Sequence, residues 1–242
     1  MSKILSKNTS SFILAVGIAL GGFFPGYYYY QSKINNNTVT VKGLAEMEVK
    51  ADLAIWTLKY VVTGNDLSVT QKKMQEQAKI INNFLQTNGL KNDEISFGRI
   101  ETNDLTANPY RNSDIKDIRF ILTQTINIKT ENVDLVEKLL AQSGDLVTKG
   151  IIFDNQSYGS PVSYIFTKLN EIKPQMLEEA TKNAKEAALE FAKNSNSKVG
   201  KIRRANQGVF SILPQEQISS VSESQQINKK IRVVSTVEYW LK

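Results

Sequence analysis

The strongest constraint on this chain is an uninterrupted apolar segment near its N-terminus. Residues 12–24 (FILAVGIALGGFF) carry no charge, and they follow a short polar stretch that contains Lys3 and Lys7. A positively charged start followed by an apolar run is typical of an export signal. A buried core helix is a poorer interpretation, because such a helix needs a polar face and this segment has none. The sequence therefore predicts that the rest of the chain folds outside the cytoplasm.

The length of this segment favours retention of the signal over its removal. From about Thr9 to Tyr30 it approaches the ~20 residues that span a bilayer, and tyrosines at its end suit the outer membrane interface. The two lysines favour a cytoplasmic N-terminus. We therefore predict a single-pass protein of the inner (plasma) membrane, anchored through residues 12–30, with its body in the periplasm.

Cleavage of the signal is the alternative, and it would leave a soluble periplasmic protein. Ala19-Leu20-Gly21 offers a weak cleavage site, but it lies inside the apolar run rather than after it. Under the anchored interpretation, residues 1–37 comprise a cytoplasmic tip, the transmembrane helix and a linker. Residues 38–242 then form one body.

Composition limits the chemistry that this body can perform. The chain contains no Cys and no His, which excludes disulfides, Cys nucleophiles, zinc fingers and His-based triads. Hydrophobic residues make up 41% and charged residues 22%, which is ordinary globular usage and enough for a packed core. A body of this length can stand on its core alone.

The net charge does not point to nucleic acid. The chain carries 30 basic and 24 acidic residues, a formal charge of +6. Residues 1–37 hold Lys3, Lys7 and Lys33 and no acid, so 27 basic and 24 acidic residues remain and the body carries only +3. A mixed-sign surface of that balance is ordinary, and no nucleic-acid partner is predicted.

Helical and alternating periodicities predict an α+β body with a mixed or antiparallel sheet. An amphipathic stripe predicts a helix that Asp66 or Ser68 caps and that ends at Asn88-Gly89. An alanine-rich stripe predicts a second long helix over residues 173–194, with Pro174 in its first turn, and a shorter helix is predicted over residues 132–142. Strands are predicted over residues 38–43 (with a turn at Gly43), 46–49, 53–63, 94–100, 118–129, 151–158, 162–166, 201–210 and 231–241.

Some of these predictions specify burial. Residues 53–63 are predicted to form a central strand covered on both faces. On the strand at 118–129 one face is predicted to carry Phe120, Leu122, Ile126 and Ile128. The stripe of the second long helix comprises Met176, Ala180, Ala184, Ala187, Ala188 and Phe191.

Two segments are predicted to lie outside the regular elements. Residues 103–114 are predicted to form a loop or strand excursion, and the Gln/Ser-rich residues 214–228 a long or mobile loop. The element order leaves open two copies of one strand–helix–strand–strand unit.

The start of the body carries a pattern that resembles a known family. The sequence TVTVKGLAEMEVKADLAIWT matches V-x-G-x-[AG]-E-x-x-V-x-[AP]-D-x-A at Val41, Gly43, Ala45, Glu46, Val49, Ala51, Asp52 and Ala54. The Asn88-Gly89-Leu90 helix exit, the Asp93–Ser96 strand entry and the helix before residues 198–202 resemble later blocks. Together these residues resemble the SIMPL-domain family, domain-of-unknown-function family 541. Many members have Pro at the position of Ala51. The alanine at this position, together with the N-terminal apolar segment, resembles the signal-anchored branch of the family.

The resemblance implies an envelope protein of a Gram-negative cell without an agreed catalytic residue. It also implies a link to oxidative-stress resistance in some relatives and homo-oligomers in others. We therefore predict a non-enzymatic structural or interaction module that binds copies of itself or an envelope partner. No catalytic, cofactor-binding or metal residue is predicted.

Glu46, Glu48 and Asp52 form the best acidic cluster, and they carry the alternative function. Glu46 and Glu48 share a face of an extended segment, so a periplasmic hydrolase or a cation-binding protein is the alternative. The structural interpretation places them at a strand edge and turn, with Asp52 accepting hydrogen bonds from local backbone N–H groups.

Three further groups have both a functional and a structural interpretation. Lys201, Arg203 and Arg204, with Lys198 nearby, could bind phosphate or anionic lipid, or could protect a strand edge; the same holds for Lys229, Lys230 and Arg232. Ser195 and Lys198 have the spacing of a Ser-Lys nucleophile, although helix capping suffices there. Trp56 and Trp240 are predicted to be core or sheet-face residues.

Overall fold

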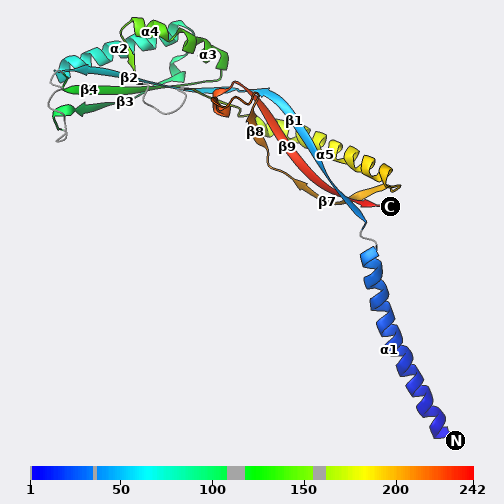
Figure 1. Ribbon diagram of the computed structural model, residues 1–242. Helices are drawn as coiled ribbons and strands as arrows, with labels where there is room; N and C mark the ends of the chain where they lie inside the picture. Colours follow the sequence, from blue (N-terminus) through cyan, green and yellow to red (C-terminus); the bar gives the residue numbers. More distant parts are fainter. Residues whose placement is uncertain (1, 35–36, 108–117, 155–161) are drawn as a thin grey trace. The chain divides into compact units, whose positions relative to one another are not determined.

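The computed structural model describes residues 2–34, 37–107, 118–154 and 162–242 (Figure 1). Contacts divide the chain into two compact units, which we describe separately. Unit 1 comprises Met1–Ala45, Met176–Val209 and Val233–Lys242, and unit 2 comprises Glu46–Gln175 and Phe210–Arg232. The division expected from the sequence, an anchor over residues 1–37 and one body over residues 38–242, stays a prediction. The α+β class is confirmed.

Unit 2 is built on a five-stranded sheet with β2 (Leu53–Gly64) at its centre. Along one side of β2 runs β4 (Phe120–Thr130), which in turn pairs with the edge strand β3 (Ile95–Asp104). The short strands β5 (Ile152–Phe153) and β6 (Val162–Ile165) pair with the other side of β2. All of these pairs are antiparallel.

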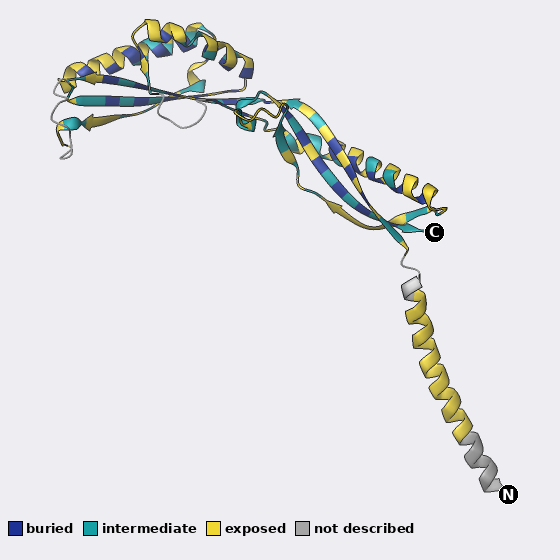
Figure 2. Ribbon diagram, in the orientation of Figure 1, coloured by how far each residue is buried: buried dark blue, intermediate teal, exposed yellow. Residues whose placement is uncertain are grey.

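Among the described residues, helices cover one face of this sheet. Three helices lie over it (Figure 1): α2 (Leu67–Thr87), α3 (Val133–Gln142) and α4 (Gly144–Thr148). The side chains of β2 therefore alternate, as the banding in Figure 2 shows. The prediction of a strand covered on both faces is wrong, although its central position is confirmed. Its buried side chains are Ala54, Trp56, Leu58, Tyr60 and Val62.

The helices of unit 2 begin and end where their capping residues predict. The Asp66 carboxylate accepts a hydrogen bond from the Val69 N–H at 2.9 Å, and Gly89 after the helix has φ +109°, the left-handed conformation that glycine adopts most easily. Asn132 caps α3 in the same way through the N–H of Leu135. Met74, Ile81 and Leu85 of the predicted stripe are fully buried against the sheet, and Ala78 is partly buried.

Strand β4 carries its four predicted apolar residues on one face, and that face also carries a glutamine. Leu122, Ile126 and Ile128 are buried and Phe120 is partly buried. Gln124 is buried among them: its Oε1 accepts from the Tyr60 hydroxyl at 2.6 Å, and its Nε2 donates to the Gly98 carbonyl at 2.9 Å. The β3–β4 register shifts between Phe97 and Ile100. The glutamine amide thus satisfies a carbonyl within that irregularity.

Unit 1 contains a second sheet covered by a helix. The sheet has the order β1 (Thr38–Lys50), β9 (Asn228–Leu241), β7 (Val199–Gln207), and the helix is α5 (Leu169–Asn194). Unit 1 holds residues 38–45 of β1, 233–241 of β9, 176–194 of α5 and all of β7. The alanine stripe faces inward, with Ala180, Ala184 and Ala188 fully buried and Ala187 partly buried. Phe191, predicted to belong to this stripe, is instead 60% exposed.

Strand β1 runs without the turn predicted at Gly43. An added Cβ at Gly43 would lie 1.8 Å from the Ala180 carbonyl oxygen and 2.5 Å from the Ala184 backbone nitrogen. Glycine at this position therefore lets α5 approach the strand closely, and it does not mark a change of direction. Helix α5 begins four residues earlier than predicted, at Leu169, so Pro174 lies beyond its first turn.

The remaining segments depart from the predictions in other ways. Strand β8 (Ser211–Pro214) pairs with β9, and the 3-10 helix η3 (Glu223–Gln225) follows it. The predicted long or mobile loop at 214–228 is thus a segment with internal contacts. The 3-10 helices η1 (Asn92–Glu94) and η2 (Leu105–Ala107) flank β3, whereas residues 108–114 and 155–158 of the predicted loop and strand lie outside the described residues. Of the predicted second strand–helix–strand–strand unit, β6 pairs with β2, whereas β9 pairs with β1 and β7 pairs with β9.

Replacement of Gly43 by Ala tests the close contact between α5 and β1. We expect the free energy of unfolding to fall by about 1–3 kcal/mol, because backbone atoms must move to admit the methyl group. Gly144→Ala is the matched control, since a Cβ there meets nothing within 4 Å. Chemical denaturation followed by circular dichroism measures both variants. Equal stability of the two variants would contradict the contact.

Candidate functional site

The N-terminal helix α1 (Ser2–Ile34) contains the predicted apolar segment. Its stretch Ser11–Gln31 has a mean hydropathy of 1.5, and none of it is buried. By length and composition this stretch is sufficient to cross a membrane. The Phe23 ring stacks on Tyr27 with centroids 5.9 Å apart, and Tyr27–Tyr30 are all exposed. The apolar helix is therefore confirmed, whereas its orientation and location stay predictions.

The acidic residues singled out in the sequence each have a partner of their own. Glu46 and Glu48 lie exposed on one face of β1, as their spacing predicts. Arg232 lies 3.6 Å from the Glu46 carboxylate, and Gln215 donates to Glu48 at 3.3 Å. Across the described part of the chain, no group of three or more Asp, Glu, His or Cys could hold a metal ion.

Asp52 has a structural partner that its sequence neighbourhood does not reveal. Its carboxylate accepts hydrogen bonds from the Thr167 backbone N–H at 2.8 Å and from the Thr167 hydroxyl at 3.0 Å. Asp52 also donates its own N–H to the Ile165 carbonyl. The predicted partner, the neighbouring backbone, is therefore wrong. Asp52 instead bonds to Thr167 and links the turn between β1 and β2 to the end of β6.

The basic cluster after the long helix lies on an edge strand. Lys201, Arg203 and Arg204 are exposed on β7, the last strand of its sheet. The Arg203 guanidinium pairs with Glu238 at 2.9 Å and lies 4.8 Å from the centre of the Trp240 ring. Charged side chains on an edge strand oppose pairing with another sheet. The predicted position on a strand edge is confirmed, whereas the choice between edge protection and anion binding stays a prediction.

Lys229 is the basic residue that the sequence interpretation misplaced. Its side chain is fully buried, and its ammonium group donates to the Glu223 carbonyl at 2.8 Å and pairs with the Glu223 carboxylate. The alternation of Lys229 with Ile231 and Val233, both buried, is the sequence signal that places it on the inner face. It is therefore not an exposed edge lysine.

Ser195 and the two tryptophans occupy structural positions. The Ser195 hydroxyl donates to the Phe191 and Ala192 carbonyls at 3.0 and 3.2 Å, which closes the end of α5. Trp56 is 1% exposed in the core of unit 2. Trp240 lies on β9 beneath the Arg203 guanidinium. Both tryptophan predictions are confirmed.

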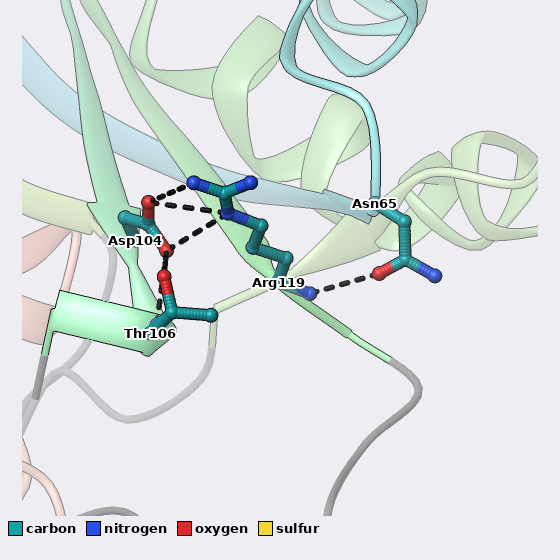
Figure 3. A network of polar contacts seen from close by, with 4 residues as sticks. All are labelled: Asn65, Asp104, Thr106 and Arg119. Carbon is teal, nitrogen blue, oxygen red and sulfur yellow. Dashed lines mark hydrogen bonds and ion pairs between the residues drawn. The ribbon is translucent and has the colours of Figure 1, made fainter.

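A polar network that sequence reasoning missed closes the base of the connection between β3 and β4 (Figure 3). The Asp104 carboxylate accepts from the Arg119 guanidinium at 3.0 Å, and from the Thr106 N–H and hydroxyl at 2.9 and 2.7 Å. The backbone N–H of Arg119 donates to the Asn65 side-chain oxygen Oδ1 at 3.0 Å. Only the strand register brings Asp104 beside residues 119 and 120, so no local pattern could predict the network.

These donors stabilise the charged form of Asp104. The hydrogen bond from Arg119, followed by those from Thr106, lowers the pKa of Asp104 from 3.8 to about 2. The ion pair with Asp104 also raises the pKa of Arg119. The network therefore acts as a fixed clamp at physiological pH, and its groups are engaged with one another rather than with a substrate.

The depressed pKa makes the clamp sensitive to acid. Because the folded-state value lies below the ordinary one, the clamp contributes stability above about pH 3.8 and loses it as the pH falls through about 2. We expect the Thr106 amide resonance to titrate near pH 2 and Asp104→Asn to speed hydrogen exchange at that amide. Asp93→Asn, on exposed η1, is the control. A Thr106 midpoint at or above pH 3.8 would exclude the clamp.

Comparison with known proteins identifies the family. Among curated proteins, no sequence matches the chain. A family model described as SIMPL, a protein of unknown function (DUF541), matches residues 39–239. The match begins directly after the apolar helix and covers both sheets and the helices packed on them. The resemblance inferred from the sequence motif is thereby confirmed, and the chain belongs to the SIMPL (DUF541) family.

Proposed function

We propose that this protein is a non-enzymatic cell-envelope protein, anchored in the inner membrane by residues 12–30 and carrying its SIMPL domain in the periplasm. The observation that carries the proposal is the fully exposed apolar helix, whose span Ser11–Gln31 ends just before the family domain begins at residue 39. A water-exposed apolar helix of this length is costly unless lipid covers it.

A binding role rather than a catalytic one agrees with the contacts of the candidate side chains. The carboxylates of Glu46, Glu48 and Asp52 each engage a separate partner. Ser195 bonds to helix carbonyls rather than to a base. These contacts favour structural roles for the residues that the hydrolase or cation-binding alternative would use.

Exposed apolar side chains in unit 1 support an interaction role. Phe191 is 60% exposed and Leu189 48% exposed near the end of α5, and Val209 after β7 is 85% exposed. Single exposed apolar residues are common on protein surfaces, whereas aromatic residues are enriched at interfaces. We propose that Phe191 contacts a second copy of the chain or another envelope protein, in a role that supports structure or stress tolerance.

Membrane anchoring is tested with a reporter and an extraction. Alkaline phosphatase fused after Lys242 is expected to be active, and the protein is expected to stay in the pellet after carbonate extraction. Ile18→Lys with Leu20→Lys places two charges near the centre of the span. Each charge costs roughly 2.5–3.5 kcal/mol there, so the double variant should lose membrane retention. A mature N-terminus near Gly22 or later would contradict the anchor, and a reporter active only in the cytoplasm would contradict the orientation.

The interaction role is tested by photo-crosslinking in intact cells. A photoreactive amino acid at Phe191 is expected to give discrete crosslinked products, which mass spectrometry then identifies as the chain itself or a partner. Val69 on α2 is 65% exposed and serves as the matched control position. Equal crosslinking at the two positions, or none at Phe191, would contradict the proposed contact.

A further inference from the structure

Unit 2 contains a pocket that none of the preceding functions uses. It has a volume of about 480 Å³ and is lined by β6, by α3 and by the segment between β8 and β9. Its apolar lining includes Leu140, Val162 and Ile227, and its polar lining includes Tyr164, Glu137 and Glu216. The lining mixes apolar and polar side chains, with Gln215, Gln225, Gln226 and Asn228 completing the polar part. A concave surface of this size with convergent polar groups is a candidate small-molecule site.

Tyr164 is a buried polar side chain that lines this pocket without a partner. It is only 5% exposed, and no hydrogen bond from the described residues reaches its hydroxyl. Burial, followed by the charges of Glu137 and Asp134, raises the pKa of Tyr164, so the hydroxyl keeps its proton. The hydroxyl oxygen is not itself among the fully buried atoms that lack a partner, so a ligand in the pocket can reach it and form a hydrogen bond with it.

The charge around Tyr164 is negative. The carboxylates of Glu137 and Glu216 form no hydrogen bond or ion pair with any described residue, and none of the described lining residues is Lys or Arg. Asp134, by contrast, is paired with Lys50 at 2.6 Å. The two carboxylates carry negative charge that no described residue neutralises, and the Tyr164 hydroxyl beside them is neutral. This arrangement favours a cationic ligand.

The wall opposite α3 is fixed by its own hydrogen bonds. The Gln226 amide donates to the Glu216 carbonyl at 2.8 Å and accepts from the Glu216 N–H at 3.3 Å, and Gln225 accepts from the Ser222 N–H at 2.9 Å. The buried Lys229–Glu223 pair holds the same segment. These amides are therefore occupied by the fold, and the Glu216 carboxylate is left for a ligand in a preformed pocket.

We propose that this pocket binds an aliphatic primary amine of the polyamine class. The methylene chain would lie on Leu140, Val162 and Ile227, and an ammonium group would donate to the Tyr164 hydroxyl and to the Glu137 or Glu216 carboxylate. An organic cation fits better than a metal ion, because the lining offers only two carboxylates together with four aliphatic side chains on which a methylene chain can lie, namely Leu140, Val162, Ile218 and Ile227. This site does not depend on the membrane anchor.

Calorimetry of the full chain in non-ionic detergent tests the site, with spermidine as the probe. We expect saturable binding at one site that weakens when the salt concentration is raised from 50 to 500 mM. Cadaverine and 1,5-pentanediol have the same chain length and differ in charge, so cadaverine should bind and pentanediol should not. Absence of saturable spermidine binding, or equal binding of the two five-carbon compounds, would overturn the proposal.

Three variants locate the binding site. Glu137→Gln and Glu216→Gln should each weaken spermidine binding about tenfold, and Tyr164→Phe about fivefold, as expected for lost hydrogen bonds to a charged group. The double change Glu186→Gln with Glu190→Gln on exposed positions of α5 makes a matched charge change in unit 1 and should have no effect. Unchanged circular dichroism shows that each variant folds. If the double variant Glu137→Gln with Glu216→Gln bound spermidine as tightly as the wild type, this pocket would be excluded as the binding site. Equal weakening of spermidine binding by the α5 control would exclude it as well.

Discussion

Both units of the body depend on the burial of one face of an antiparallel sheet beneath helices. The chain has no cysteine, so no disulfide limits the unfolded state, and helix–sheet contact has to supply the stability. In unit 2 the contact is made by large side chains such as Trp56, Ile81 and Leu139, all of which are buried. In unit 1 it is made by alanines of α5, which pack closely because Gly43 has no side chain. The same constraint is thus met by two different kinds of packing.

Polar groups inside these units position the elements that apolar burial alone leaves free to slide. Tyr60 and Gln124 link neighbouring strands and reach the Gly98 carbonyl of the edge strand. Asp52 joins the β1–β2 turn to the end of β6 through Thr167. Each such group would be costly if left unpaired in a buried site. They therefore fix the register of the sheet, and with it the position of the segments that line the pocket at Tyr164.

The sequence predicted elements whose signals are local. Asp66, Asn132 and Gly89 act through residues within one helical turn, so the ends of α2 and the start of α3 could be predicted from their neighbours. Gly43 was misinterpreted because its role depends on Ala180, far away in the sequence. Lys229 was predicted to be exposed, because nothing in the Gln/Ser-rich segment 214–228 indicates that its Glu223 pairs with a buried lysine. The Asp104–Arg119 clamp depends on strand register, and the pocket at Tyr164 is formed by segments that are distant in the sequence. Neither feature leaves a local sequence pattern from which it could be predicted.

The buried pair of Lys229 and Glu223 has a consequence for how the body opens. An ammonium group taken out of water is strongly destabilising once its carboxylate leaves. Separation of the segment that carries Glu223 from β9 would break this ion pair and the hydrogen bond to the Glu223 carbonyl. The pair therefore opposes local opening of a connection rich in glutamine and serine.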